Sequence, residues 1–147
     1  IDAGRSIPLS ALAPLLTVPG VRLISLQKNF GLAQLADLPD GAVETLGDDF
    51  DAGPDAFIDT AAVMANLDLV ITSDTSVAHL AGALGHPAWV ALRAVPEWRW
   101  LLGRSDSPWY PSLRLFRQPT PGDWSAVFAE MARVLADDVA APSRSPV

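Results

Sequence analysis

The fold can be predicted from one segment, residues 67–85, which reads Leu67-Asp68-Leu69-Val70-Ile71-Thr72-Ser73-Asp74-Thr75-Ser76-Val77-Ala78-His79-Leu80-Ala81-Gly82-Ala83-Leu84-Gly85. The apolar run at Asp68–Thr72 predicts a strand, and the small polar residues that follow predict a turn. The next residues, Thr75–Leu84, predict a helix, which Gly85 and Pro87 end. A strand, a polar turn and a helix in this order form the repeating unit of a parallel α/β sheet.

The rest of the chain extends this alternation on both sides. Strands are predicted at Val21–Leu26, Val43–Leu46, Asp68–Thr72, Ala88–Leu92 and Leu113–Phe116. Helices are predicted at Leu9–Thr17, Leu32–Ala36, Ala61–Leu67 (capped by Asp59 or Thr60), Thr75–Leu84 and Trp124–Leu135 (capped by Asp123). Strands that are apolar throughout and alternate with helices predict a doubly wound, Rossmann-like α/β fold. We expect one domain over residues 1–139 and a disordered tail over residues 140–147.

Composition limits the classes of partner. The chain has 147 residues, half of them hydrophobic, and a net charge of -7, which argues against nucleic acid or an anionic membrane surface as partner. It lacks an apolar run of the roughly 20 residues that span a bilayer, so we expect a soluble domain with no membrane span. The absence of cysteine suits the cytoplasm. Because the chain begins at Ile1, we expect it to be a fragment of a longer protein.

Two groups of polar residues are predicted at the carboxyl ends of strands, where α/β sheets bind ligands. Lys28, the only lysine in the chain, follows the first strand, and Ser73–Ser76 follow the third. The helix that starts there offers free N–H groups and the positive end of its dipole to a diphosphate. The alternative is that Asp74 or Thr75 only caps the helix and that His79, off the apolar stripe, is merely exposed. The face of the predicted helix that we expect to pack on the core consists of Val77, Leu80, Ala81 and Leu84.

Three other features have open interpretations. The loop at Pro96–Pro111 contains aromatic residues that either stack on a base or sugar or pack onto the sheet, and packing is favoured for most of them: Trp98, Trp100, Trp109 and Tyr110. Arg99 and Arg104 in this loop either contact phosphate or are surface charges. The acidic cluster Asp48, Asp49, Asp51 and Asp55 lacks the spacing of an EF-hand, so we expect a solvated loop. His86 is predicted to be a turn residue.

The segment at Leu67–Ala81 resembles the donor-site signature of glycosyltransferase family 9, the heptosyltransferase-like enzymes. Further segments resemble bacterial proteins that join such a domain to tetratricopeptide repeats: Ser25–Lys28, Asp59–Ala62, Trp98–Trp100, Ser107–Pro111 and Arg114–Gln118. The resemblance covers about residues 5 to 138. It implies the C-terminal half of a GT-B glycosyltransferase, whose N-terminal domain, with the general base, is missing here.

The resemblance also implies roles for particular residues in binding a nucleoside-diphosphate sugar. Lys28 would contact the donor phosphates, the start of the helix at Thr75–Val77 would hold the diphosphate, Asp74 would meet the sugar, and His79 would lie near the diphosphate. Gln27 and Ser73 belong to the same predicted donor site, and Asp59, Thr60, Trp98 and Arg99 are further candidates. Such enzymes work without a metal or another cofactor.

Two functions follow from these observations. The first is the donor-binding domain of an inverting, metal-independent glycosyltransferase, inactive without its N-terminal domain and able to self-associate through the face that this domain would cover. The second is a non-catalytic module that binds a nucleotide, a sugar or another protein. The fold is the same in both cases. The presence of Lys28, Asp74 and Thr75 together favours the first.

Overall fold

A three-stranded parallel sheet forms the centre of the computed structural model, which describes residue 4 and residues 6–141. The strands lie in the order β1 (Val70–Ser73), β2 (Ala88–Leu92) and β3 (Leu113–Arg117). Ile71 is paired with Trp89, and Val90 with Leu115. Each of the three strands overlaps a predicted strand, with β1 and β3 ending one residue later than predicted, and their parallel pairing confirms the α/β class.

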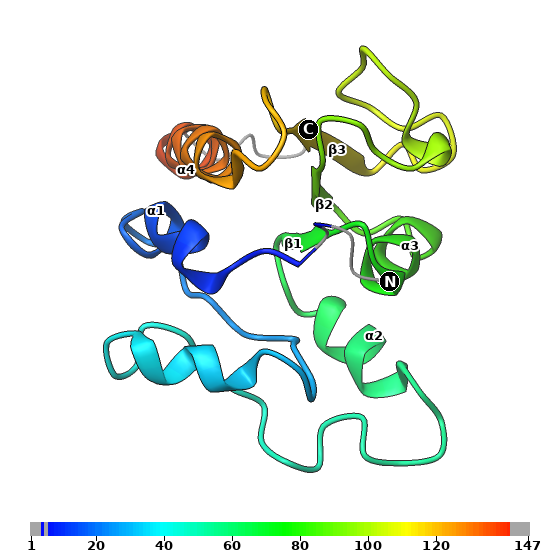
Figure 1. The fold of residues 1–147 in the computed structure, drawn as a ribbon. Coiled ribbons are helices and arrows are strands. Elements are labelled where there is room, and N and C mark those ends of the chain that lie inside the picture. The colour runs from blue at the N-terminus through cyan, green and yellow to red at the C-terminus, as the bar shows by residue number, and fades with distance from the viewer. Residues whose placement is uncertain (1–3, 5, 142–147) are drawn as a thin grey trace.

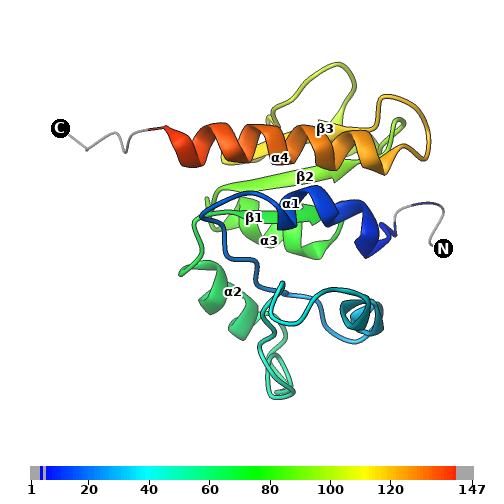
Figure 2. The same ribbon diagram turned by 90° about the vertical axis from the view of Figure 1, so that its left-hand side faces the viewer.

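Helices cover both faces of this sheet (Figure 1). A 3-10 helix at Leu9–Leu12, the short α1 (Ala13–Leu16) and the long α4 (Trp124–Ala140) pack on one face. The other face is covered by α2 (Ile58–Met64) and α3 (Ser76–Ala83). Figure 2 shows α4 lying along the strands. This layering is compatible with a Rossmann-like fold.

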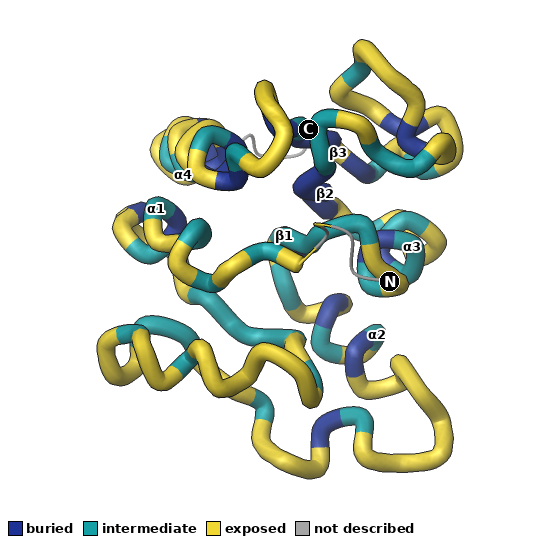
Figure 3. The backbone as a smooth tube through the Cα atoms, viewed as in Figure 1, coloured by how far each residue is buried: buried dark blue, intermediate teal, exposed yellow. Residues whose placement is uncertain are grey.

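The core consists of two clusters separated by the sheet. Trp89, Ala91 and Phe116 face α4, whereas Ala88, Val90 and Leu92 face α3. All five residues of β2 are buried, as expected for the central strand of a covered parallel sheet (Figure 3). The prediction of a strand at Ala88–Leu92 within a covered parallel sheet is therefore confirmed.

The two strands predicted first in the chain are not formed as strands. Within the described residues, Val21–Leu26 and Val43–Leu46 share one parallel bridge, between Ile24 and Glu44. The two backbone hydrogen bonds of this bridge are Ser25 N–H to Glu44 O and Glu44 N–H to Leu23 O, each 2.8 Å. Gly41 and Gly47 both have positive φ, so the chain turns on either side of the short segment that holds Glu44.

Helix ends differ from prediction in several places. The predicted helix Leu9–Thr17 is a 3-10 turn followed by one α-helical turn, and the predicted helix near residues 32–36 is a 3-10 helix at Leu32–Asp37. α4 continues to Ala140, past the predicted end at Leu135 and into the predicted tail; residues 142–147 lie outside the described part of the chain. α3 ends as predicted, because Gly85 has a φ of 66° and its N–H and that of His86 bond to Gly82 and Ala81.

The connection from β2 to β3 is a loop rather than an α-helix. It contains a 3-10 helix at Trp98–Trp100, and Trp100 is 1% exposed within the cluster on the α3 side of the sheet. The ring of Tyr110 packs against the same cluster. These two aromatic side chains cover β2 and β3 on the face where a crossover helix would otherwise lie.

Candidate functional site

A small pocket opens at the carboxyl ends of β1 and β2. Ser73 and Asp74 line it from the β1 side, Ala91, Leu92 and Arg93 from β2, and Pro96 and Trp124 complete the wall. This is the edge of a parallel sheet at which loops and helix N-termini meet, and it is where α/β proteins bind ligands. Two predicted site residues, Ser73 and Asp74, therefore line one pocket.

The turn between β1 and α3 is tight. Thr75 N–H donates to Ser73 O over 2.8 Å, and the hydroxyls of Thr72 and Thr75 lie 3.2 Å apart. Thr75 is the N-cap residue of α3, but its side chain accepts no hydrogen bond from the helix. Ser76 is exposed as the first residue of α3, and Val77 packs on the core. Capping by the Thr75 hydroxyl therefore does not explain this polar turn.

His79 does not line the pocket but packs against the loop at Pro96–Pro111, which we call the aromatic loop. Its ring stacks on Trp100 with centroids 5.4 Å apart, and its Nδ1 lies 3.3 Å from the Tyr110 hydroxyl. The predicted core stripe of α3 needs correction as well: Ala78 and Ala81 are fully buried, whereas Leu84 is 53% exposed. Because α3 is short and covered from the loop side, its buried face is rotated toward Ala78.

Lys28 and Gln27 belong to a different part of the molecule from the pocket. The Lys28 ammonium donates to the carbonyl of Phe50, and Gln27 Nε2 donates to Phe30 O over 2.6 Å. Among the described residues, no hydrogen bond links Lys28 to Ser73–Ser76. The predicted donor constellation is thus divided between two places.

Asp59 and Thr60 bind Asp51 rather than capping the helix themselves. α2 begins at Ile58, and the Asp51 carboxylate accepts from Asp59 N–H (3.1 Å) and from the Thr60 hydroxyl. In return, Asp51 N–H donates to Asp59 Oδ2 over 2.8 Å. The acidic segment is therefore not wholly solvated, because one of its members fixes the start of α2.

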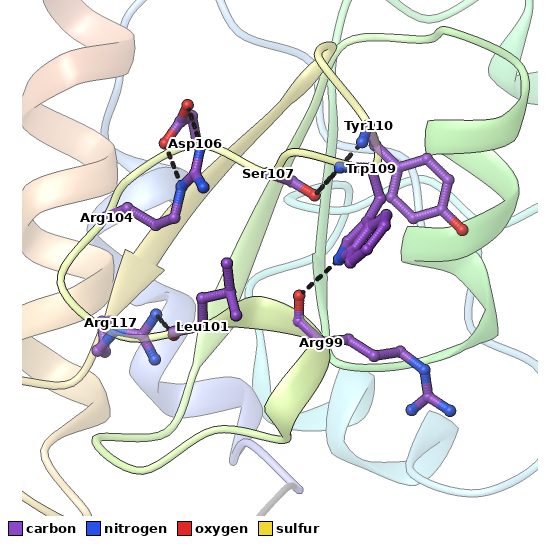
Figure 4. Close-up of polar contacts among 8 residues, drawn as sticks. All are labelled: Arg99, Leu101, Arg104, Asp106, Ser107, Trp109, Tyr110 and Arg117. Atoms are coloured by element: carbon purple, nitrogen blue, oxygen red, sulfur yellow. Dashed lines mark hydrogen bonds and ion pairs between the residues drawn. The ribbon is translucent and has the colours of Figure 1, made fainter.

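Figure 4 shows how polar contacts hold the aromatic loop. Trp109 Nε1 donates to Arg99 O over 3.0 Å, Arg117 donates to Leu101 O over 2.8 Å, and Arg104 binds Asp106 through two hydrogen bonds of 2.7 Å. Burial lowers the pKa of the Arg117 guanidinium, whereas the hydrogen bonds from Arg104 lower the pKa of Asp106.

The aromatic side chains of this loop divide into two kinds. Packing is confirmed for Trp100 and Tyr110. Trp98 is 69% exposed and Trp109 59% exposed, so packing does not explain them. The Arg99 guanidinium lies 4.9 Å from the Trp98 ring centroid and pairs with Glu97. Neither Trp98 nor Arg99 lines the pocket.

Sequence reasoning missed the other five residues of the pocket wall, among them Arg93 and Trp124. Arg93 follows β2 just as Asp74 follows β1, so its position after a predicted strand was a usable signal. Trp124 is the first residue of α4, and nothing local distinguishes it from a core residue. Its neighbour Asp123 caps α4 as predicted, accepting from Ala126 N–H over 3.0 Å.

Two features are absent from the described part of the chain. Residues 4 and 6–141 hold no group of three or more His, Asp or Glu side chains arranged to bind a metal ion. In the same part of the chain, no helix has the length and apolarity needed to cross a bilayer.

The fold and the pocket define an α/β protein with a parallel sheet and a small pocket at the carboxyl ends of its strands. The chain is similar to Protein FlbA of Caulobacter vibrioides (strain ATCC 19089 / CIP 103742 / CB 15), with 33% identity over 134 residues. The match covers 88% of this chain and 22% of FlbA, so the chain spans about a fifth of the length of that relative. No protein-family model and no solved structure matches the chain.

Proposed function

We propose that this chain is the donor-binding domain of an inverting, metal-independent glycosyltransferase. Its ligand would be a nucleoside-diphosphate sugar, and sugar transfer would require an N-terminal domain that is not in this sequence. The proposal takes the chain as the C-terminal half of a GT-B enzyme in the cytoplasm.

The observation that supports this proposal best is the pocket that unites Ser73, Asp74 and Arg93 at the sheet edge. A carboxylate such as Asp74 accepts hydrogen bonds from sugar hydroxyls, and Arg93 supplies a cation suited to phosphate. The free start of α3 next to Ser73 adds N–H groups and a helix dipole for a diphosphate. The resemblance to family 9 at Leu67–Ala81 points to the same residues.

The proposal predicts different effects for the nucleotide and sugar parts of the donor. Calorimetric titration with a panel of nucleoside diphosphates and nucleotide sugars identifies the base. For that base, Asp74→Asn should weaken the nucleotide sugar about tenfold, because it removes a charged acceptor from the sugar. The same variant should leave the free diphosphate unchanged or bound more tightly, since a negative charge is lost.

A matched control is Asp68→Asn, which changes a carboxylate at the other end of the β1 segment. This variant should bind both ligands like the unaltered chain. Equal weakening of both ligands by Asp74→Asn would contradict the role of Asp74 in sugar binding. Absence of binding to every member of the panel at millimolar concentration would contradict the donor-domain proposal.

One observation favours the second function, a non-catalytic binding module. Lys28, the cation expected on the donor phosphates, donates to Phe50 O instead of lining the pocket. Lys28→Ala separates the two functions. A donor domain in which Lys28 turns toward bound diphosphate should lose affinity, whereas a module that binds through the pocket alone should not.

A further inference from the structure

Gln118 connects the two loops that form opposite walls of the pocket. It follows β3, and its backbone N–H donates to Leu92 O over 2.9 Å, which extends the pairing with β2 by one step. The side chain is 4% exposed. Its Oε1 accepts from Ala94 N–H over 3.3 Å and from Gly122 N–H over 3.2 Å.

These two acceptor bonds lie next to the pocket on both sides. Ala94 stands between Arg93 and Pro96, which line the pocket, and Gly122 precedes Asp123 and the pocket residue Trp124. Because both partners are N–H donors, the amide must present its oxygen to them, and this fixes the orientation of the group. One buried atom therefore bonds to the segment after β2 and to the segment before α4.

In the described part of the chain, the Gln118 amide leaves one buried donor without a partner, and this loss of stability indicates that its oxygen is needed as an acceptor. Gln118 Nε2 is buried and has no hydrogen-bond partner among the described residues. A buried donor without a partner is destabilising. A glutamine whose role was only to fill the core could be replaced by an apolar side chain without that cost, whereas an acceptor for two backbone N–H groups could not.

We infer that Gln118 is a positioning residue for the pocket: it sets the separation of the Arg93 and Trp124 walls and thereby the affinity for the nucleotide part of the ligand. This inference rests on the proposed function, because it takes a nucleoside diphosphate as the occupant. Gln118 does not line the pocket and acts through Arg93, Pro96 and Trp124.

The test compares Gln118→Met, which keeps the volume but removes the acceptor, with Gln118→Glu, which keeps an acceptor. Amide hydrogen exchange is measured without ligand. In Gln118→Met the amides of Ala94 and Gly122 should exchange at least about tenfold faster, and in Gln118→Glu they should stay protected, since each bond contributes on the order of 1 kcal/mol. Unchanged exchange in Gln118→Met would overturn the inference.

Binding is then measured with the nucleoside diphosphate that the unaltered chain binds best. Gln118→Met should raise the Kd about tenfold, because the walls are no longer held at one separation. The matched control is Val134→Ala, a cavity in α4 away from the pocket, which lowers stability and should leave the Kd unchanged. An equal rise in Kd in both variants would show a general loss of stability and overturn the inference.

The outcomes separate this inference from the proposed function. If the unaltered chain binds no nucleotide but Gln118→Met exposes both amides, the donor-domain proposal fails and Gln118 still holds the two walls. If nucleotide binds and Gln118→Met changes neither exchange nor affinity, the inference fails and the proposed function stands. Should Gln118→Met not fold, Gln118→Asn decides: it keeps a neutral amide but is too short to reach both N–H groups, so unchanged protection of both amides there contradicts the acceptor role.

Discussion

At the scale of single residues, Gly82 is required by a close approach between α3 and the aromatic loop. A Cβ atom built on Gly82 would lie 2.4 Å from Cγ and 2.9 Å from Cβ of Tyr110. A χ1 rotation of Tyr110 would move Cγ but leave Cβ in place, so a rotamer change alone cannot relieve the clash. The glycine therefore allows Tyr110 to pack on α3 and to reach His79.

Gly82→Ala should lower the free energy of unfolding by about 1–3 kcal/mol, because overpacking outweighs the gain of about 1 kcal/mol in helix propensity. Urea denaturation measures this difference. In a Tyr110→Ala background the same substitution should be neutral or stabilising, since the clash is gone. An equally destabilising effect in both backgrounds would contradict the contact with Tyr110.

At the scale of secondary-structure elements, the start of α2 depends on a residue outside the helix. Asp51, seven positions before Ile58, accepts from Asp59 N–H and from the Thr60 hydroxyl. Asp51→Ala should lower stability by about 1–2 kcal/mol, as loss of a helix cap does. The control is Asp48→Ala on the exposed part of the same acidic segment, which should change stability by less than about 0.5 kcal/mol.

The free energy of unfolding of Asp51→Ala and Asp48→Ala is measured by urea denaturation, and the exchange rate of the Asp59 amide is measured in both variants. Faster exchange at Asp59 in Asp51→Ala, with an unchanged helix α4, would locate the loss at the start of α2. If Asp48→Ala and Asp51→Ala were equally destabilising, the effect would come from the acidic charge of the segment and not from the cap.

At the level of the whole molecule, several apolar side chains are exposed in the segment that joins β2 and β3. Val95 is 74% exposed, Leu102 71% and Trp98 69%. We predict that the isolated chain self-associates through this surface, so its mass by light scattering should rise with concentration. The double variant Trp98→Ser with Leu102→Ser should reduce this rise, whereas Phe30→Ser, at an exposed position in another segment, should not. A constant monomeric mass over a wide concentration range would contradict the prediction.

The sequence by itself determined the elements whose signals are local. The apolar run of β2 predicted a strand buried on both faces, Gly85 predicted the end of α3, and Asp123 predicted the cap of α4. The places of Ser73 and Asp74 were also predictable, because residues at the carboxyl end of a parallel strand lie at the edge of the sheet where α/β proteins bind ligands.

Contacts between residues far apart in the chain could be seen only in the folded protein. Two segments predicted as strands share one rung, and the chain turns at glycines on either side of the short segment that holds Glu44. Lys28 bonds to Phe50, His79 packs on Trp100, and Gln118 joins two loops, since each contact depends on where the chain returns after many residues. Local patterns specify a residue's element and face, but the partner of its side chain is set by packing of the whole chain.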